Sequence, residues 1–390
     1  MIVALGHSED LDSVDAIAEA LDACAETLRE KTPQAGLLYA GIAHDHQALL
    51  DSIEARYTGL PLIGCTTHGE LSSDGFAEDS VVLMLFHSER VQFRTGVGEG
   101  VRGDPEGAAR RAAAMAKDGL TQPVRLGIIV PEGLGIDVNA VTDTFHSVLG
   151  PDVPVCGGLA GDQVRFETTR QFCNGRVYTD AVPVLVLAGP VLVATGVASG
   201  WVPTGDEHRL TNTERQTIIE IDGEPVRDVW NRYFGSFEIR GSRNQFVIYP
   251  DGDAAREFYL CAPSHFTEDG SMVTLNPVID GARIRFADAT RDQVLDGAGA
   301  SAESARAGYV GTPDAALVFS CAGRHALLGT QVGREIGLLQ EHVGADVPTI
   351  GFYTYGEICP LPGSQTPYTH GATFVTVLIG EDQSLVGKDD

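Results

Sequence analysis

Lysine is scarce in this sequence, and long hydrophobic runs are missing. Only three of the 27 basic residues are lysines, against 54 acidic residues, so the net charge is −27. Such an excess of negative charge repels nucleic acid and anionic lipid, and we expect neither as a partner. No apolar run approaches the roughly 20 residues that a membrane-spanning helix needs, so we expect no membrane insertion.

The acidic, lysine-poor composition suits solubility in concentrated salt, where repulsion between charges is screened. We therefore hypothesise a halophilic protein. The alternative is a GC-rich genome that favours arginine codons, and folding stability that is indifferent to molar KCl would contradict halophily. The first residues, MIVALGHSEDLD, have no basic start and turn acidic at once. They do not resemble a secretory signal, and we expect a cytoplasmic location.

Paired cysteine motifs are also missing. The chain has seven cysteines, an odd number, and none of them forms a C-x-x-C pair. This spacing excludes a standard disulfide framework and a zinc module. No Gly-Lys-Ser/Thr phosphate-binding loop occurs either, so the glycine-rich stretch GGLAGD (157–162) is a weak candidate for phosphate.

One pattern occurs three times along the chain. Each copy has an apolar stretch of strand length, a segment with helical spacing, a Pro-led strand and a glycine-rich turn. Further strand material follows each copy, which predicts repeated β-α-β-β units. The strand and turn segments are AGLLYAGIAHD (35–45) with PLIGCTTHGEL (61–71), VRLGIIVPEG (124–133) with PVCGGLAGD (154–162), and AALVFSCAGR (315–324) with PTIGFYTYGEI (348–358).

Different material lies between the second and third copies. Residues 200–288 alternate strand-like segments with Asp-Gly turn signals, and residues 292–310 form an alanine-rich pattern that predicts a helix. We predict a two-domain α/β protein with mixed sheets, in two lobes with a cleft between them. The expected domains are residues 1–210 and 211–390.

These motifs resemble the FIST family, the F-box and intracellular signal transduction proteins. PLIGCTTHGEL, CGGLAGD and GWVPTG...IIEIDGEPV resemble the FIST N-terminal domain and its junction, and FSCAGR and GFYTYGEICP resemble the FIST C-terminal domain. The resemblance covers about residues 30 to 380. It implies a sensory module that binds small ligands such as amino acids, and some members resemble haem-binding nitric-oxide sensors.

The Gly-Glu turns hold the first candidate site residues. Glu70 and Glu357 each follow a strand in an equivalent turn, where α/β proteins commonly bind ligands. A pair of carboxylates across a cleft suits an ammonium group, and Thr67 is a candidate contact beside them. The alternative is that each glutamate accepts hydrogen bonds from its own turn and holds the loop.

Arg324, Asp162 and Tyr355 complete the expected ligand site. Arg324 can clamp a carboxylate through its planar fork of donors, or form an ion pair with Glu357. Asp162 ends the second copy near the place that the glutamates occupy in the others. Tyr355 lies beside Glu357, where an aromatic ring suits a cationic group.

Two other classes of function compete. His68, in Cys65-x-x-His68, is the best candidate for a haem or metal ligand, which would make the protein a gas sensor. A cysteine-dependent enzyme using Cys65 or Cys321 is the third possibility. We expect no enzyme, no cofactor and no metal. The leading hypothesis is a sensor that binds an amino acid and signals through a separate protein, such as a histidine kinase or chemoreceptor.

Overall fold

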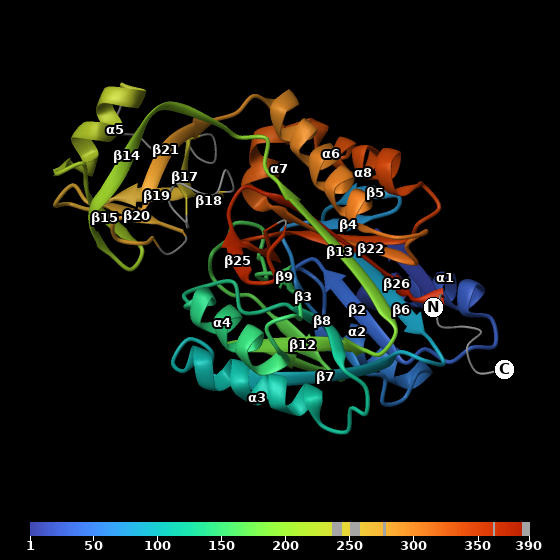
Figure 1. Cartoon of the computed structure of the whole chain (residues 1–390). Helices are drawn as coiled ribbons and strands as arrows, with labels where there is room; N and C mark the ends of the chain where they lie inside the picture. The colour runs from blue at the N-terminus through green and yellow to red at the C-terminus, as the bar shows by residue number, and fades with distance from the viewer. Residues whose placement is uncertain (236–243, 250–257, 276–277, 362, 384–390) are drawn as a thin grey trace.

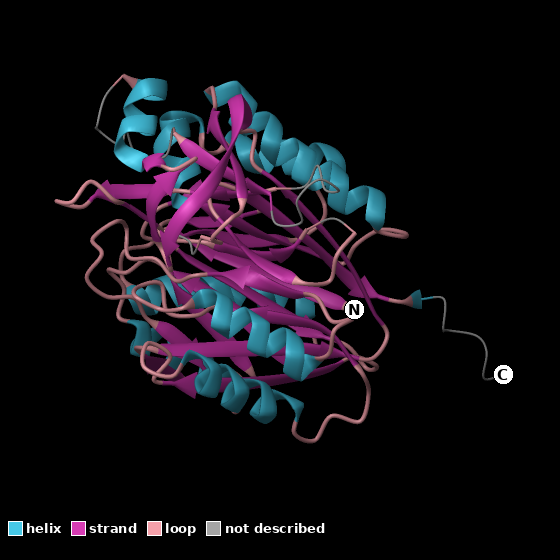
Figure 2. Cartoon of the chain, turned by 60° about the vertical axis from the view of Figure 1, so that its left-hand side comes forward, coloured by secondary structure: helices cyan, strands magenta, loops and turns pink. Residues whose placement is uncertain are grey.

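The computed structural model describes residues 1–235, 244–249, 258–275, 278–361 and 363–383 (Figure 1). Most of the described chain forms a body of three mixed sheets, with helices on the outer faces (Figure 2). A fourth sheet stands beside this body, at the left of Figure 1. The expected α/β class with mixed sheets is confirmed.

The body is built from three copies of one unit, which confirms the predicted repeat. Each copy is longer than the sequence pattern indicated, because a strand and a helix precede it. The first copy is β1 Ile2–Ser8, α1 Ser13–Leu28, β2 Ala35–Ala40, α2 His46–Arg56, β3 Leu62–Thr66, β4 Glu70–Ser72, β5 Gly75–Ala77 and β6 Val81–His87.

The second and third copies follow the same order, with a short extra helix in the third. The second is β7 Gln92–Glu99, α3 Pro105–Lys117, β8 Val124–Ile129, α4 Val138–Leu149, β9 Val155–Gly158, β10 Gln171–Cys173, β11 Arg176–Tyr178 and β12 Ala181–Ala188. The third is β13 Val191–Ala198, α6 Arg291–Gly308, β22 Ala315–Cys321, α7 Ala322–Leu328, the 3-10 turn Gly329–Gln331, α8 Arg334–Val343, β23 Thr349–Thr354, β24 Glu357–Pro360, β25 Pro367–His370 and β26 Phe374–Glu381.

Each copy gives its short hairpin to the sheet of another copy. The hairpin β4–β5 extends the third sheet beside β23, β10–β11 extends the first sheet beside β3, and β24–β25 extends the second sheet beside β9. Because every copy gives one hairpin and receives one, the three sheets are linked in a closed ring. The exchange also covers one edge of each central sheet with a paired strand.

The repeated glycine of the Pro-led strands has a steric cause. A Cβ atom added to Gly64, Gly157 or Gly351 would lie 1.8, 1.9 or 2.1 Å from a carbonyl oxygen of the neighbouring parallel strand. No side chain fits at such a distance, so each strand needs glycine for its close approach. The glycine shared by the three Pro-led strands is therefore a packing requirement of the repeated unit.

The inner faces of the three sheets form one continuous hydrophobic core. Met84 and Phe86 from the first sheet, Leu185 from the second, and Phe319 and Phe352 from the third are fully buried in this cluster. Burial of each such side chain stabilises the fold by about 1.5–3 kcal/mol. The helices pack on the outer faces, α1 against β1, α3 against β7 and α6 against β13.

The fourth sheet is an insertion between β13 and α6 of the third copy, which we call the inserted lobe. It has its own core around Trp230 and Phe286. The predicted Asp222–Gly223 turn is confirmed, with φ angles of 54° and 77°. The described elements of the lobe are β14 Val202–Glu214, β15 Thr217–Ile221, β16 Glu224–Pro225, α5 Val226–Phe234, β17 Gln245–Tyr249, β18 Tyr259–Cys261, β19 Pro263–Phe266, β20 Met272–Thr274 and β21 Arg283–Asp288.

The expected domain division at residues 210 and 211 falls inside β14. The third copy of the unit lies on both sides of this point, with β13 before it and α6 after the inserted lobe. The helix predicted over residues 292–310 is confirmed as α6, and it begins with a capping box between Thr290 and Gln293.

Gly351 lies in a crowded Pro-led strand and Gly337 in an open helix face, which predicts opposite effects when each is replaced by alanine. Gly351→Ala should destabilise the protein by about 3 kcal/mol, because the new methyl group would meet the carbonyl of Val318. Gly337→Ala, in the exposed face of α8 with open space around it, should stabilise by about 0.5–1 kcal/mol. Thermal denaturation of both variants in matched salt measures this difference. Equal melting temperatures would contradict the steric explanation.

Candidate functional site

In each exchanged hairpin, the side chain of the first residue hydrogen-bonds to the start of the strand that follows the hairpin. Glu70 Oε2 accepts from the amide of Ser80 at 3.0 Å and from its hydroxyl at 2.8 Å. Glu357 Oε2 accepts the same pair of bonds from Thr373, at 3.1 and 2.7 Å. In the second copy, Gln171 Oε1 accepts from the amide at the start of β12 at 3.2 Å. These side chains are buried and hold their own loops, which is the structural role considered above as the alternative to ligand binding by the glutamates.

Gln171 was missed from the sequence, where Asp162 was expected to match the glutamates. The reason is the loop of residues 159–170, which separates β9 from β10 and moves the hairpin away from the glycine-rich turn. Asp162 lies within this loop and accepts hydrogen bonds from the amides of residues 166–168. It therefore shapes the loop rather than the hairpin end.

Burial controls the ionisation of the two glutamates. It raises the pKa of Glu70 to about 7, against the opposing effect of hydrogen bonds from Thr67 and Ser80. It raises the pKa of Glu357 to about 8, against the bonds from Thr373. Thr67, also predicted as a ligand contact, is buried and donates to Glu70 Oε1. A ligand role for these three residues stays a prediction.

Arg324 is fully buried, and its partner is Glu335 rather than Glu357. Its Nε and Nη2 donate to Glu335 Oε1 at 2.9 and 2.6 Å. Nη1 donates to the carbonyl oxygen of Ser199 at 2.5 Å, and Nη2 also donates to that of Val294 at 2.7 Å. The expected ion pair with Glu357 is therefore wrong as a direct contact. Arg324 joins α7 to α6, α8 and the end of β13, so its hydrogen bonds stabilise the fold.

Tyr355 and Asp162, both predicted from the sequence, come together in the structure. The Tyr355 hydroxyl donates to Asp162 Oδ1 at 2.5 Å and accepts from the amide of Val164 at 2.6 Å. Burial, followed by this bond to Asp162, raises the pKa of Tyr355. The pair joins the turn of the third copy to the loop of the second.

His68 lies where the first and third turns meet. Its Nε2 is 3.1 Å from Nδ1 of His325, and its backbone amide donates to Tyr353. Burial, followed by the charge of His325, lowers the pKa of His68 to about 4. No group of three or more His, Cys, Asp or Glu residues is placed to hold a metal ion within the described ranges. A haem-ligand role of His68 stays a prediction.

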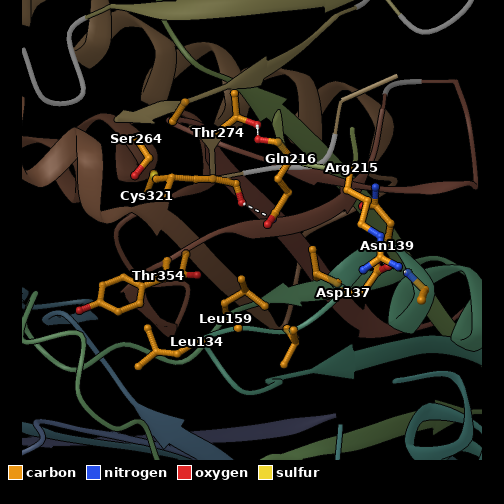
Figure 3. A pocket seen from close by; sticks show the side chains of 18 of the residues that line it. Leu134, Asp137, Asn139, Leu159, Arg215, Gln216, Ser264, Thr274, Cys321 and Thr354 are labelled. Carbon is orange, nitrogen blue, oxygen red and sulfur yellow. Dashed lines mark hydrogen bonds between the residues drawn. The ribbon is translucent and has the colours of Figure 1, made fainter. Parts of the chain in front are cut away.

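A cavity of about 1170 Å³ lies between the inserted lobe and the body (Figure 3). One wall is the loop before α4 with the first turns of that helix, a second belongs to the third copy, and the inserted lobe supplies the third. Of the predicted ligand contacts, Tyr355 lines this cavity, and so does Cys321, a candidate nucleophile of the third possibility. Glu70, Glu357, Arg324, Thr67 and Asp162 are not among its described lining residues. The walls include Leu134, Asp137 and Asn139; Cys321, Thr354 and Ala372; and Arg215, Gln216, Ser264 and Thr274.

Basic, acidic and apolar side chains all line the cavity. The basic lining residues are Arg102, Arg110 and Arg215, and the acidic ones include Asp137 and Asp143. Burial raises the pKa of Asp143, against the effect of His146. The apolar part consists of side chains such as Leu134, Ile136, Leu159, Val164, Phe166 and Leu275.

Most of these cavity residues were missed because they come from three distant segments. One local signal was present in the sequence: polar residues at a strand end and a helix start, such as Cys321 and Asp137, mark places where α/β proteins bind ligands. The polar turn Arg215-Gln216 between two strands was a second signal.

Family models match nearly the whole cavity-forming region. The FIST N domain matches residues 34–224, and the FIST C domain matches residues 227–360. The chain belongs to the FIST family. FIST domains are sensory domains of signal-transduction proteins. The two matches meet between residues 224 and 227, at the end of β16 and the start of α5.

Two individual comparisons add little about activity. Uncharacterized protein MJ1623 from Methanocaldococcus jannaschii is 26% identical over 224 residues, which is 55% of this FIST protein and 43% of the relative. This FIST protein thus matches less than half the length of that relative. Among solved structures, cyanuric acid hydrolase from A. caulinodans matches with 12% identity over 97% of this chain and 99% of that chain. Its TM-score of 0.38 supports no conclusion about function.

Within the described residues, each helix is too short or too polar to cross a bilayer.

The buried carboxylate of Glu70 predicts a pH dependence of folding. The unfolded state ionises this group near 4.5, whereas the folded state keeps the proton until about 7. The unfolded state thus binds fewer protons in this range, and stability falls as the pH rises through it. Above pH 7, Glu70→Gln should avoid up to about 3 kcal/mol of the loss in folding stability that ionisation of Glu70 causes. Glutamine fits, because Gln171 fills the equivalent position.

Urea denaturation from pH 4.5 to 8 measures this effect. The exposed Glu26→Gln substitution controls for the removal of one carboxylate. A stability difference between wild type and Glu70→Gln that does not change with pH would contradict the assignment.

Proposed function

We propose that this FIST protein is a cytoplasmic sensor that binds an amino acid or amino-acid derivative in the cavity beside the inserted lobe. The observation that carries the proposal is the composition of the walls. Side chains of the inserted lobe and of the body line the same cavity of about 1170 Å³. A ligand that contacts both parts favours one arrangement of the lobe over others, which is how binding can produce a signal.

The charged groups support a ligand with both charges. Arg215 extends from the turn between β14 and β15, and its guanidinium group suits a carboxylate. Asp137 and Asp143 lie on the α4 wall and suit an ammonium group. Arg215 belongs to the lobe and the two aspartates belong to the body, so a zwitterion held by these three residues would bridge the lobe and the body.

The size and apolar surface support a ligand with a substantial apolar side chain. Small-molecule sites commonly have volumes of about 300–1,000 Å³ and mostly apolar walls. The present cavity exceeds that range, and Leu134, Phe166 and Leu275 supply apolar contacts. Large apolar amino acids, or derivatives of them, therefore fit better than glycine or alanine.

The signal would pass to a separate protein, for which a histidine kinase or chemoreceptor is the proposed class. The inserted lobe is the part that a bound ligand would move relative to the body. We propose that such a partner contacts the lobe and the body together, because that surface changes when their arrangement changes.

A thermal-shift screen of the twenty amino acids at millimolar concentration, in matched salt, tests ligand binding. At least one large apolar amino acid should raise the melting temperature. Arg215→Gln should require about ten-fold more of that ligand for the same shift, because one charged contact of about 1.4 kcal/mol is lost.

Arg209→Gln is the matched control, since Arg209 is an exposed arginine of the same lobe and is not among the described cavity residues. The absence of any stabilising amino acid would contradict the ligand class. Equal weakening by the two arginine substitutions would contradict the site.

A further inference from the structure

Cys156 and Cys359 lie side by side in the central core. Cys156 belongs to β9 of the second copy and Cys359 to β24 of the third, and their sulfur atoms are 3.8 Å apart. Both side chains are fully buried in the apolar cluster between the three sheets. A pair of thiols in contact thus spans the joint where the hairpin of the third copy enters the second sheet.

The register of the two strands places these cysteines opposite each other. Ile358 lies opposite Gly157 in the antiparallel pairing of β24 with β9. One residue further along, the same register brings Cys359 opposite Cys156. Side chains of directly opposite residues stand on the same face of a sheet and contact each other. The backbone pairing therefore holds the two thiols together.

The equivalent joints of the other copies hold one thiol or none. Each counterpart of Cys359 lies two residues after the first residue of its hairpin. In the second copy it is Cys173, which faces Ile63 of β3. In the first copy it is Ser72, which faces Ile350 of β23. The repeated fold therefore does not require two facing thiols, and their presence distinguishes the joint between the second and third copies.

This joint also supports one wall of the cavity. Leu159 follows β9, Tyr355 lies shortly before β24, and both line the cavity. The Tyr355 amide donates to the carbonyl oxygen of Leu159 at 3.3 Å, and the Leu159 amide donates to that of Gly356 at 2.9 Å. A covalent bond between the two strands would thus fix the segments that carry this part of the wall.

The backbone geometry of the pair suits a disulfide. The Cα atoms of a disulfide are usually about 4.4–6.8 Å apart. Directly opposite residues of antiparallel strands have Cα atoms about 4.5–5.5 Å apart, so the strands already meet this requirement. Rotation of the two side chains can close the remaining distance between the sulfur atoms.

We propose that Cys156 and Cys359 are an oxidation site, at which hydrogen peroxide converts the two thiols to a reversible disulfide. One sulfur attacks a peroxide oxygen and breaks the O–O bond, which gives a sulfenic acid and one water. The other sulfur attacks the sulfenic sulfur and displaces a second water. Two thiols and one hydrogen peroxide thus give one disulfide and two waters. The thiols supply the two electrons, and their protons leave in the waters.

Burial determines which oxidant can react. Neither side chain has exposed surface, so a protein or a bulky disulfide compound cannot contact the sulfur atoms of the folded protein. Hydrogen peroxide is small and uncharged. The hydrogen bond with Cys359, followed by burial, raises the pKa of Cys156, so thiolate is scarce and the first step is slow. The second thiol is already in contact, and it traps the sulfenic acid before further oxidation.

Peptide mapping of wild-type protein tests the site. The folded protein is treated with millimolar hydrogen peroxide, unfolded with N-ethylmaleimide to block the remaining thiols, and digested without reductant. A linked peptide pair that contains Cys156 and Cys359 should appear, with the loss of two of the seven free thiols, and dithiothreitol should restore both. Free thiols at both positions, or sulfinic acid without the linked peptides, would overturn the proposal.

Cys359→Ala and Cys173→Ala are matched variants, because they remove equivalent cysteines from two hairpins. Cys359→Ala should abolish the linked peptides and the paired loss of thiols. Cys173→Ala should form the link between Cys156 and Cys359 at a rate within about two-fold of wild type. A paired loss of thiols in Cys359→Ala, or a ten-fold slower link in Cys173→Ala, would overturn the assignment. If Cys359→Ala does not fold, the wild-type peptide map decides.

Thermal denaturation tests whether the bond strengthens the joint. It would connect residues 203 positions apart in the chain, and so would restrict the unfolded state. Oxidised wild type should melt about 4–6 °C above the same sample kept in dithiothreitol, and Cys359→Ala should show no such difference. Equal melting temperatures of oxidised and reduced wild type would overturn this role of the bond. The proposal does not rest on the ligand site, so amino-acid binding and peptide mapping can fail separately.

Discussion

The structure depends on the exchange of three hairpins whose first residues are held by buried hydrogen bonds. Glu70, Gln171 and Glu357 each lie in a hairpin that has joined the sheet of another copy. Each side chain accepts a hydrogen bond from the backbone amide at the start of the strand that follows its hairpin. If one of the three sheets separated from the others, a hairpin would be exposed to solvent and these hydrogen bonds would break. Two of the three side chains are carboxyl groups in an apolar interior, so burial raises the pKa of each.

The functional features gather where the third copy departs from the other two. This copy contains the inserted lobe, which supplies one wall of the cavity. It also carries Arg324, whose contacts with Glu335 fix the helix after β22. The repeated body supplies the α4 wall and the inserted lobe supplies the wall that carries Arg215, so the proposed binding site lies where the addition meets the body.

The sequence predicted the repeated unit correctly, because the Ile-Gly frame reflects a local steric requirement at Gly64 and Gly351. The helix after the inserted lobe and the Asp222–Gly223 turn were also local signals. The exchange of hairpins was not predictable, because nothing local specifies which sheet a hairpin joins. The cavity was largely missed because its walls come from three distant segments, and Tyr355 and Cys321 are the residues named from the sequence that line it.

The most direct test of the ring is native-state amide hydrogen exchange. The amides of Ser80 and Thr373, held by Glu70 and Glu357, should exchange with the same free energy of opening as the central strands β2 and β22. This result is expected because a hairpin in a neighbouring sheet opens only when the body unfolds. Exchange of either hairpin at less than about half that free energy would show that it detaches locally. That outcome would contradict a closed ring as the constraint on which the fold depends.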